Sequence, residues 1–116
     1  MKKSRVKSQE PEWRLARVAL LLTALWAPPA VAADHVVNQK DKIFSHSEIT
    51  IKPGDTVTFK NGDEVSHNVY SSTPGMEFEI RRQAPGASST VPFPKAGKVD
   101  VQCSIHPKMK LTVHVK

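Results

Sequence analysis

Short runs of alternating apolar and polar residues constrain the fold of this chain more than any other feature. After residue 33 such runs cover 56–60, 76–80 and 111–115, and Pro-Gly pairs stand at 53–54, 74–75 and 85–86. Alternation with a period of two predicts strands with one buried face, and the Pro-Gly pairs predict turns between them. We find no helical periodicity of useful length after residue 33, so the pattern predicts about six to eight short strands in an all-β, antiparallel Greek-key sandwich.

Three details of this strand pattern can be compared with a structure. Val99, Val101 and Cys103 share one face of a strand predicted over 98–103, and Pro92 indicates an edge strand because proline cannot donate to a sheet ladder. We expect a loop over 81–86. The segment 35–44 is left open, either as one first strand with a bulge or as two short pieces.

The N-terminal segment has the pattern of an export leader. Lysines and arginines precede an apolar run over 18–27, and small residues occupy 30–33. The apolar run is shorter than the roughly 20 residues that a spanning helix needs, and prolines follow it directly, so we do not expect a membrane anchor. The sequence therefore predicts a signal peptide over 1–33, cleaved after Ala33 or one residue earlier, and a mature periplasmic domain over 34–116 that has no membrane span.

The net charge argues against binding to nucleic acid. The whole chain carries a formal charge of +6, but residues 34–116 hold eleven basic and nine acidic side chains, a net charge of +2. Both tryptophans lie in the leader, so no indole remains to stack on bases. No acid–base pair and no Ser/His/Asp order indicates hydrolysis, and we expect a monomer that is not an enzyme.

The C-terminal segment concentrates metal-binding side chains around the single cysteine. Cys103, His106 and Met109 offer thiolate, imidazole and thioether donors within seven residues. His67, thirty-six residues before the cysteine, supplies a second imidazole from another strand. Two His, one Cys and a Met form the donor set of a type 1 copper site, whereas structural zinc normally needs a fourth Cys, His or carboxylate. We therefore predict one copper ion bound by these four residues, which also explains an unpaired thiol in an exported chain.

Other candidate residues receive a structural interpretation. His114 falls on the polar face of the last predicted strand and His46 lies among polar residues, so both are expected to be solvated. His35 is close to the predicted mature N-terminus, and we do not expect it to bind copper. We predict that Asn68 hydrogen-bonds across to the cysteine loop, because such bonds hold the geometry and tune the potential of a copper site.

These residues carry a family resemblance that spans nearly the whole mature domain. The stretch 54–59 with Asn61 and His67-Asn68-Val69, and then Phe93, Cys103, His106-Pro107 and Met109, resembles the cupredoxins, most closely the amicyanin and plastocyanin-like group. The resemblance implies a cupredoxin fold, copper bound by His67, Cys103 and His106 with Met109 axial, and electron entry through the exposed edge of His106. One departure concerns 99–102, which lacks the aromatic residues that the family often has there.

The expected function is that of a blue-copper carrier of single electrons between periplasmic redox proteins. The resemblance implies a dehydrogenase as donor or a c-type cytochrome as acceptor, and amicyanins take electrons from a methylamine dehydrogenase. A copper-handling protein that delivers or stores the metal is the alternative, and a dedicated accessory to one oxidase or dehydrogenase is a third possibility. We expect the partner surface to be the apolar patch around His106, with Ile105 and Pro107 beside it.

Overall fold

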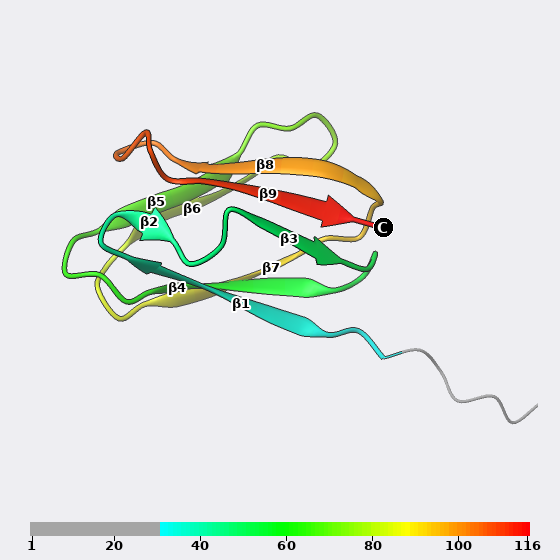
Figure 1. The fold of residues 1–116 in the computed structure, drawn as a ribbon, viewed down its shortest axis with the longest axis horizontal. Coiled ribbons are helices and arrows are strands. Elements are labelled where there is room, and N and C mark those ends of the chain that lie inside the picture. The colour runs from blue at the N-terminus through cyan, green and yellow to red at the C-terminus, as the bar shows by residue number, and fades with distance from the viewer. Residues whose placement is uncertain (1–30) are drawn as a thin grey trace, which may run out of the picture. The chain divides into compact units, whose positions relative to one another are not determined.

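The computed structural model describes residues 31–116, which fold into two β-sheets packed face to face (Figure 1). No helix in this part of the chain is long and apolar enough to cross a membrane. Residues 1–30 of the predicted leader lie outside the described residues. The strands in order are β1 (Asp34–Lys40), β2 (Ile43–Phe44), β3 (Glu48–Ile51), β4 (Thr56–Asn61), β5 (His67–Ser71), β6 (Phe78–Gln83), β7 (Ser88–Pro92), β8 (Gly97–Cys103) and β9 (Lys110–Val115).

The strand order confirms the all-β sandwich and refines its topology. One sheet has the order β2-β1-β4-β7 and the other has the order β3-β9-β8-β5-β6, so β7, with Pro92, lies at an edge as predicted. The sheets are mixed, because β1 pairs with β4 and β3 pairs with β9 in parallel. Alternation reports which face of a strand is buried and not its direction, which is why the sequence could not show the two parallel pairs.

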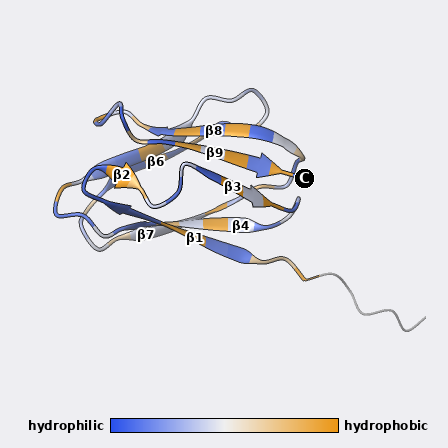
Figure 2. Ribbon diagram, viewed as in Figure 1, coloured by the Kyte–Doolittle hydropathy of each residue, from blue (hydrophilic) through white to orange (hydrophobic). Residues whose placement is uncertain are grey.

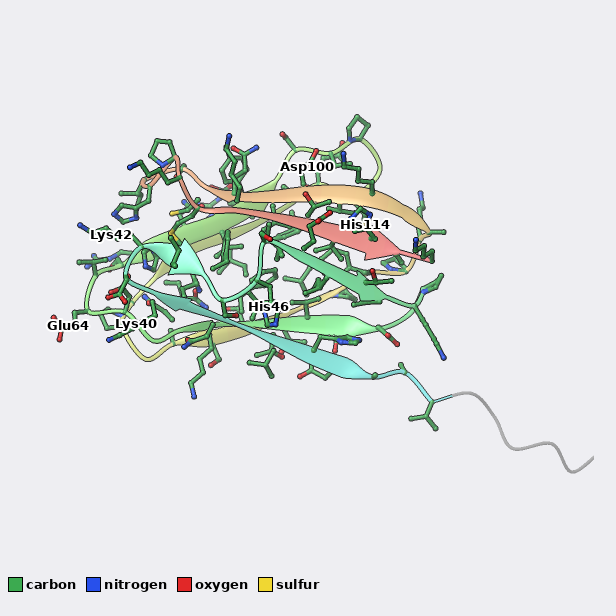
Figure 3. The ribbon with its side chains drawn as sticks, viewed as in Figure 1. Lys40, Lys42, His46, Glu64, Asp100 and His114 are labelled. Carbon is green, nitrogen blue, oxygen red and sulfur yellow. The ribbon has the colours of Figure 1, made fainter. Side chains whose placement is uncertain are left out.

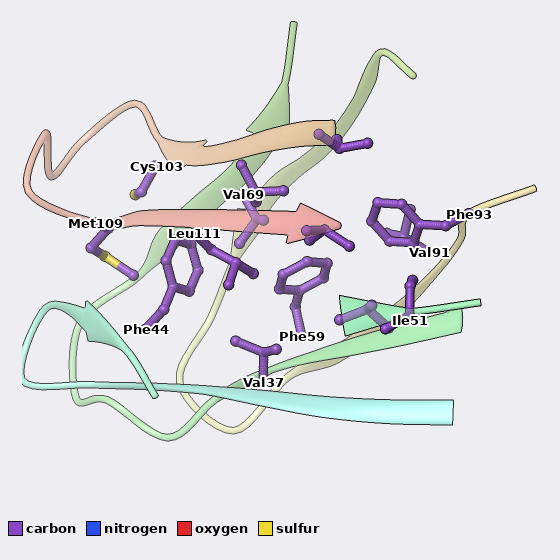
Figure 4. Close-up of a cluster of buried hydrophobic side chains, with 14 of the residues drawn as sticks. Val37, Phe44, Ile51, Phe59, Val69, Val91, Phe93, Cys103, Met109 and Leu111 are labelled. Carbon is purple, nitrogen blue, oxygen red and sulfur yellow. The ribbon is translucent and has the colours of Figure 1, made fainter. Parts of the chain in front are cut away.

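The core lies between the sheets and follows the alternating pattern (Figures 2 and 4). In β8, Val99, Val101 and Cys103 are buried, while Lys98 and Asp100 are exposed. Phe59 is fully buried, with its ring centroid 6.2 Å from that of Phe44. Burial of each such side chain stabilises the fold by about 1.5 to 3 kcal/mol, so both sheets are held by the residues that the period of two identifies.

Two segments differ from the simplest interpretation of the sequence. The segment left open at 35–44 forms two pieces, β1 and β2, joined by Asp41 and Lys42 with φ angles of 54° and 61°. Two consecutive positive φ angles are typical of a tight hairpin turn. The loop predicted over 81–86 begins only after Gln83, because β6 continues to that residue and buries its side chain in a polar network that hydrophobic alternation does not detect.

Candidate metal centre

Neighbouring strand ends bring the predicted ligands together at one end of the sandwich. His67 is the first residue of β5 and Cys103 is the last residue of β8, and these two strands are adjacent in their sheet, with Val69 opposite Cys103. The loop from β8 to β9 then carries His106, and Met109 directly precedes β9. A hydrogen bond of 2.9 Å from the Met109 amide to the His106 carbonyl closes this loop tightly.

Three donor atoms converge on one point. The Nδ1 atoms of His67 and His106 are 3.1 Å apart, and each lies 3.9 Å from the Sγ atom of Cys103. The point equidistant from these three atoms lies roughly 2.1 Å from each of them. This distance is about the length of a bond from a first-row metal ion to an imidazole nitrogen or a thiolate sulfur. The three side chains therefore fit a single metal ion without rearrangement, and they form the one such His/Cys/Asp/Glu group found among the described residues.

Burial shapes what this centre can bind and how it reaches the surface. His67 and Met109 are completely buried and Cys103 is 2% exposed, whereas His106 is only partly buried. Met109 and Cys103 lie at the same end of the core (Figure 4). A buried, sulfur-rich pocket with two imidazoles suits an ion that alternates between Cu(I) and Cu(II). The partly exposed His106 is the route from this pocket to the solvent.

The electrostatic surroundings keep the His106 imidazole available as a ligand. Burial is the main cause that lowers the pKa of His106 below its usual value of 6.5, with a smaller contribution from the positive charge of Lys42 that Asp63 opposes. The neutral ring keeps a lone pair on nitrogen at neutral pH, which a metal ion requires.

Asp63 fixes the orientation of the His67 ring, a contact that we did not predict. Its Oδ2 atom lies 3.0 Å from Nε2 of His67 and accepts a hydrogen bond of 2.8 Å from the Lys42 amide. The Lys42 bond is the largest of the contacts that lower the pKa of Asp63 to about 2. A carboxylate on one ring nitrogen directs the lone pair of the other toward a metal. The signal in the sequence was an aspartate four residues before the histidine, but the contribution of the β1–β2 turn depends on tertiary structure.

The contact between residue 68 and the cysteine exists, but the backbone makes it. The backbone amide of Asn68 donates to Sγ of Cys103 at 3.4 Å, and the backbone carbonyl of Asn68 accepts from the Ser104 amide at 3.3 Å. The side-chain Oδ1 of Asn68 has no hydrogen-bond partner in the structure. We therefore correct the prediction: the backbone amide of residue 68, which lies at an irregularity in the β5–β6 register between His67 and Val69, makes the contact with the sulfur.

A network of buried amides supports the loop that holds Asp63. The Asn61 side chain donates to the carbonyls of Val65 and Gln83, and its Oδ1 atom accepts from the Asp63 amide, all at 2.9 Å. Gln83 in turn accepts from the buried Gln39 side chain at 2.7 Å. These hydrogen bonds join the loop to β4 and β6, so the loop that orients His67 is held from below.

The remaining histidines lie away from the centre. His114 lies 2.9 Å from a Glu48 carboxylate oxygen, His46 contacts the Ser45 hydroxyl, and His35 contacts Asp55. Figure 3 shows His114 and His46 apart from the end that carries Lys42. None of the three belongs to the cluster of His67, Cys103 and His106.

Comparisons with known proteins agree with this geometry. A family model described as "Copper binding proteins, plastocyanin/azurin family" matches residues 31–116. The chain is 31% identical to the methylamine utilization protein MauL of Methylophilus methylotrophus over 72% of this chain, and it spans half of that protein's length. It is 36% identical to amicyanin-alpha of Methylorubrum extorquens, over 63% of this chain and 64% of that protein.

Solved structures give the same result. The crystal structure of amicyanin from Paracoccus versutus is 32% identical, with a TM-score of 0.63 over 77% of this chain and 85% of that one. Family, fold and donor cluster together show a cupredoxin with one type 1 copper. The chain therefore belongs to the plastocyanin/azurin family of copper-binding proteins, and its relatives include amicyanins.

Proposed function

We propose that His67, Cys103, His106 and Met109 hold the copper ion and that the protein carries single electrons between redox partners in the periplasm. The observation that carries this proposal is the convergence of two imidazole nitrogens and one sulfur on a single buried point. Bound copper supplies one-electron chemistry by alternating between Cu(I) and Cu(II). The residues of the chain do the rest: they keep water out, hold the donor atoms in place and bring one ring edge to the surface.

Rigidity is what the protein contributes to electron transfer. Asp63 and the Asn68 amide fix His67 and the Cys103 sulfur from outside the cluster, and the short turn from His106 to Met109 limits loop movement. Ligands that barely move between oxidation states make the exchange of an electron fast, whereas a protein that delivers copper must release its ion. The structure thus supports a carrier more than a copper-handling protein.

The surface around His106 supports docking of a redox partner. His106 and Pro107 line a shallow depression with Ile43 from the β1–β2 hairpin, and Ile43 and the neighbouring Ile105 are each 55% exposed. Apolar side chains at the centre of a patch exclude water when a partner docks. This patch is therefore the proposed contact surface, with His106 as the point of electron entry.

The charged rim of this patch favours an acidic partner. Lys42 and Lys108 line the same depression as His106, and Figure 3 shows Lys40 and Lys42 at this end of the molecule. Residues 40–42, the loop before β5 and residues 104–110 close this end of the domain. Their exposed charged side chains are four positive ones, Lys40, Lys42, Lys108 and Lys110, and two negative ones, Asp41 and Glu64. An excess of positive charge steers negatively charged partners toward the patch and does so less at high salt.

The leader and the partners are part of the same proposal. We propose that the leader is a signal peptide that ends at Ala33 or one residue earlier, that the remainder up to residue 116 forms the cupredoxin domain, and that the exported protein is monomeric. The donor is a dehydrogenase and the acceptor a c-type cytochrome. The names of two relatives refer to methylamine utilization and amicyanin, so a dehydrogenase that oxidises methylamine is the first donor to assay.

Voltammetry of the copper-loaded protein tests the carrier function. We expect a reversible one-electron couple together with an intense visible absorption band from thiolate-to-copper charge transfer. A protein that binds Cu(I) tightly, shows no such band and gives no reversible couple is a copper-handling protein, and that result would refute the carrier. Size-exclusion chromatography of the same sample tests the monomer.

A further inference from the structure

At the end of the sandwich where β1 begins, a buried carboxylate binds the first residues of the domain. Asp55 is 4% exposed, and its Oδ1 atom accepts a hydrogen bond of 2.9 Å from the Ala33 amide. Its Oδ2 atom accepts from the Lys52 amide and lies 3.0 Å from Nε2 of His35. These contacts, of which the Ala33 bond is the largest, lower the pKa of Asp55 to about 2. Asp55 is thus an anion whose main partner is the backbone nitrogen of residue 33.

Ala33 is held at both ends of its backbone although it precedes β1. Besides its amide bond to Asp55, its carbonyl accepts a hydrogen bond of 2.9 Å from the Thr56 amide, which opens the pairing of β1 with β4. Residues 31–33 are all exposed, with Val31 89% exposed, so it is these two backbone hydrogen bonds and not burial that distinguish Ala33. The part of the chain that the domain needs therefore begins at Ala33.

The sequence allows cleavage of the leader on either side of Ala33, and the structure distinguishes the two sites. We propose that the exported chain is hydrolysed between Ala32 and Ala33, and that the new α-ammonium group of Ala33 is bound by Asp55 in the mature protein. The proposal rests on the export leader assigned above. The oxygen of a water molecule bonds to the carbonyl carbon of Ala32, which becomes a carboxylate. The C–N bond breaks, and the signal peptidase releases Ala33 with a protonated amine. Ala30-Val31-Ala32 supplies the small residues that such an enzyme requires before the cut.

The two cleavage products differ in the hydrogen-bond donors that remain for Asp55. A product that begins at Ala33 keeps the nitrogen donor in place and adds a positive charge, and hydrogen bonds between charged groups are about twice as strong as neutral ones. A product that begins at Asp34 loses the Ala33 amide and carbonyl, which leaves Asp55 Oδ1 and the Thr56 amide without these partners. Unsatisfied buried polar groups are costly, so the shorter product is less stable.

The first experiment measures the mass of the mature protein. The full chain, with its own leader, is expressed in a host that exports it to the periplasm, and the purified product is analysed by intact-mass spectrometry. We expect a product that begins at Ala33. A product that begins at Asp34 overturns this proposal but leaves the export proposal intact, whereas an uncleaved chain overturns both.

A second experiment tests the bond to Asp55. The α-amine is labelled with an acylating reagent at pH 8 in native protein and in urea, and the labelled N-terminal peptide is quantified. A carboxylate partner raises the pKa of the amine above its ordinary value of about 8, so we expect labelling of the native protein to be at least roughly tenfold slower. Equal rates in the native and unfolded protein overturn the proposal, whatever the behaviour of any variant.

Variants of the exported chain separate this bond from a general effect of charge. Asp55→Asn should bring native labelling close to the unfolded rate and lower the melting temperature by roughly 4 to 8 °C or more. Asp100→Asn, the same change at an exposed site, should alter neither. The other titratable groups beside Asp55 are His35, Lys52 and Lys116, which remain in both variants.

The bond also predicts a pH dependence of stability. A raised amine pKa stabilises the fold below about pH 8, and this stabilisation is lost as pH rises through the raised pKa. The difference in melting temperature between wild type and Asp55→Asn should therefore shrink at alkaline pH.

Discussion

Substitution of Met109 tests the copper site directly, because a buried methionine can be either a copper ligand or only a residue of the hydrophobic core. The side chain is fully buried at the start of β9. In the copper-free protein, Met109→Leu conserves volume and should cost less than about 1.5 kcal/mol, whereas Met109→Ala should cost about 2 to 5 kcal/mol. Since about 1 kcal/mol shifts the melting temperature of a domain of this size by roughly 4 to 8 °C, calorimetry resolves the two variants.

The copper-loaded protein then separates a ligand from a packing residue. Replacing a thioether by a hydrocarbon removes a donor, which weakens the binding of Cu(II) more than that of Cu(I). We therefore expect Met109→Leu to raise the reduction potential, by on the order of 60 mV for each tenfold change in the relative affinity for the two oxidation states. Leu111→Met is the matched control, since Leu111 is buried two residues further along the chain, in β9.

The control should leave the potential unchanged and cost no more stability than Met109→Leu. If Met109→Leu changes the melting temperature of the copper-free and copper-loaded protein equally and shifts neither the potential nor the visible spectrum, Met109 is a core residue and the axial assignment is wrong.

Three further changes probe the surroundings of the centre. Asn68→Ala should leave the potential unchanged, because the backbone amide and not the side chain donates to Cys103, and a clear shift in voltammetry would contradict this assignment. Asp63→Asn should raise the potential, because it removes a negative charge that favours Cu(II), and an unchanged or lower value would exclude this role for the contact with His67. Lys42→Glu should slow oxidation by hexacyanoferrate(III) in stopped-flow measurements at low ionic strength, and an equal slowing at high salt would rule out steering by charge.

The structure clusters three of the four residues that the sequence predicts as ligands, because their chemistry and their places on strands are local features. Cys103 ends a strand with an alternating pattern, and His106 and Met109 follow it within one short loop. This single stretch therefore indicates the donor set of a copper site. His67 could be added because it begins another strand with the same pattern. The all-β sandwich followed from the same alternation.

The supporting contacts could not be predicted, because each joins segments that are distant in sequence. The bond from Lys42 to Asp63 requires the β1–β2 turn to lie against the loop before β5, and its geometry depends on two positive φ angles. The Asn68 backbone amide reaches the sulfur at a register irregularity, which a side-chain pattern does not encode. For the same reason, the extension of β6 to Gln83 depends on a buried amide partner and not on hydrophobic alternation.

The visible spectrum of the Cu(II)-loaded protein, recorded beside that of Cys103→Ser, tests the central claim most directly. The geometry brings one cysteine sulfur and two imidazole nitrogens within 4.8 Å of one another, so the wild type should show an intense charge-transfer band that saturates at one equivalent of copper. Cys103→Ser should lack this band entirely, while circular dichroism shows that it keeps its β structure. A wild type without the band, or a variant that retains it, would contradict the proposed ligand set.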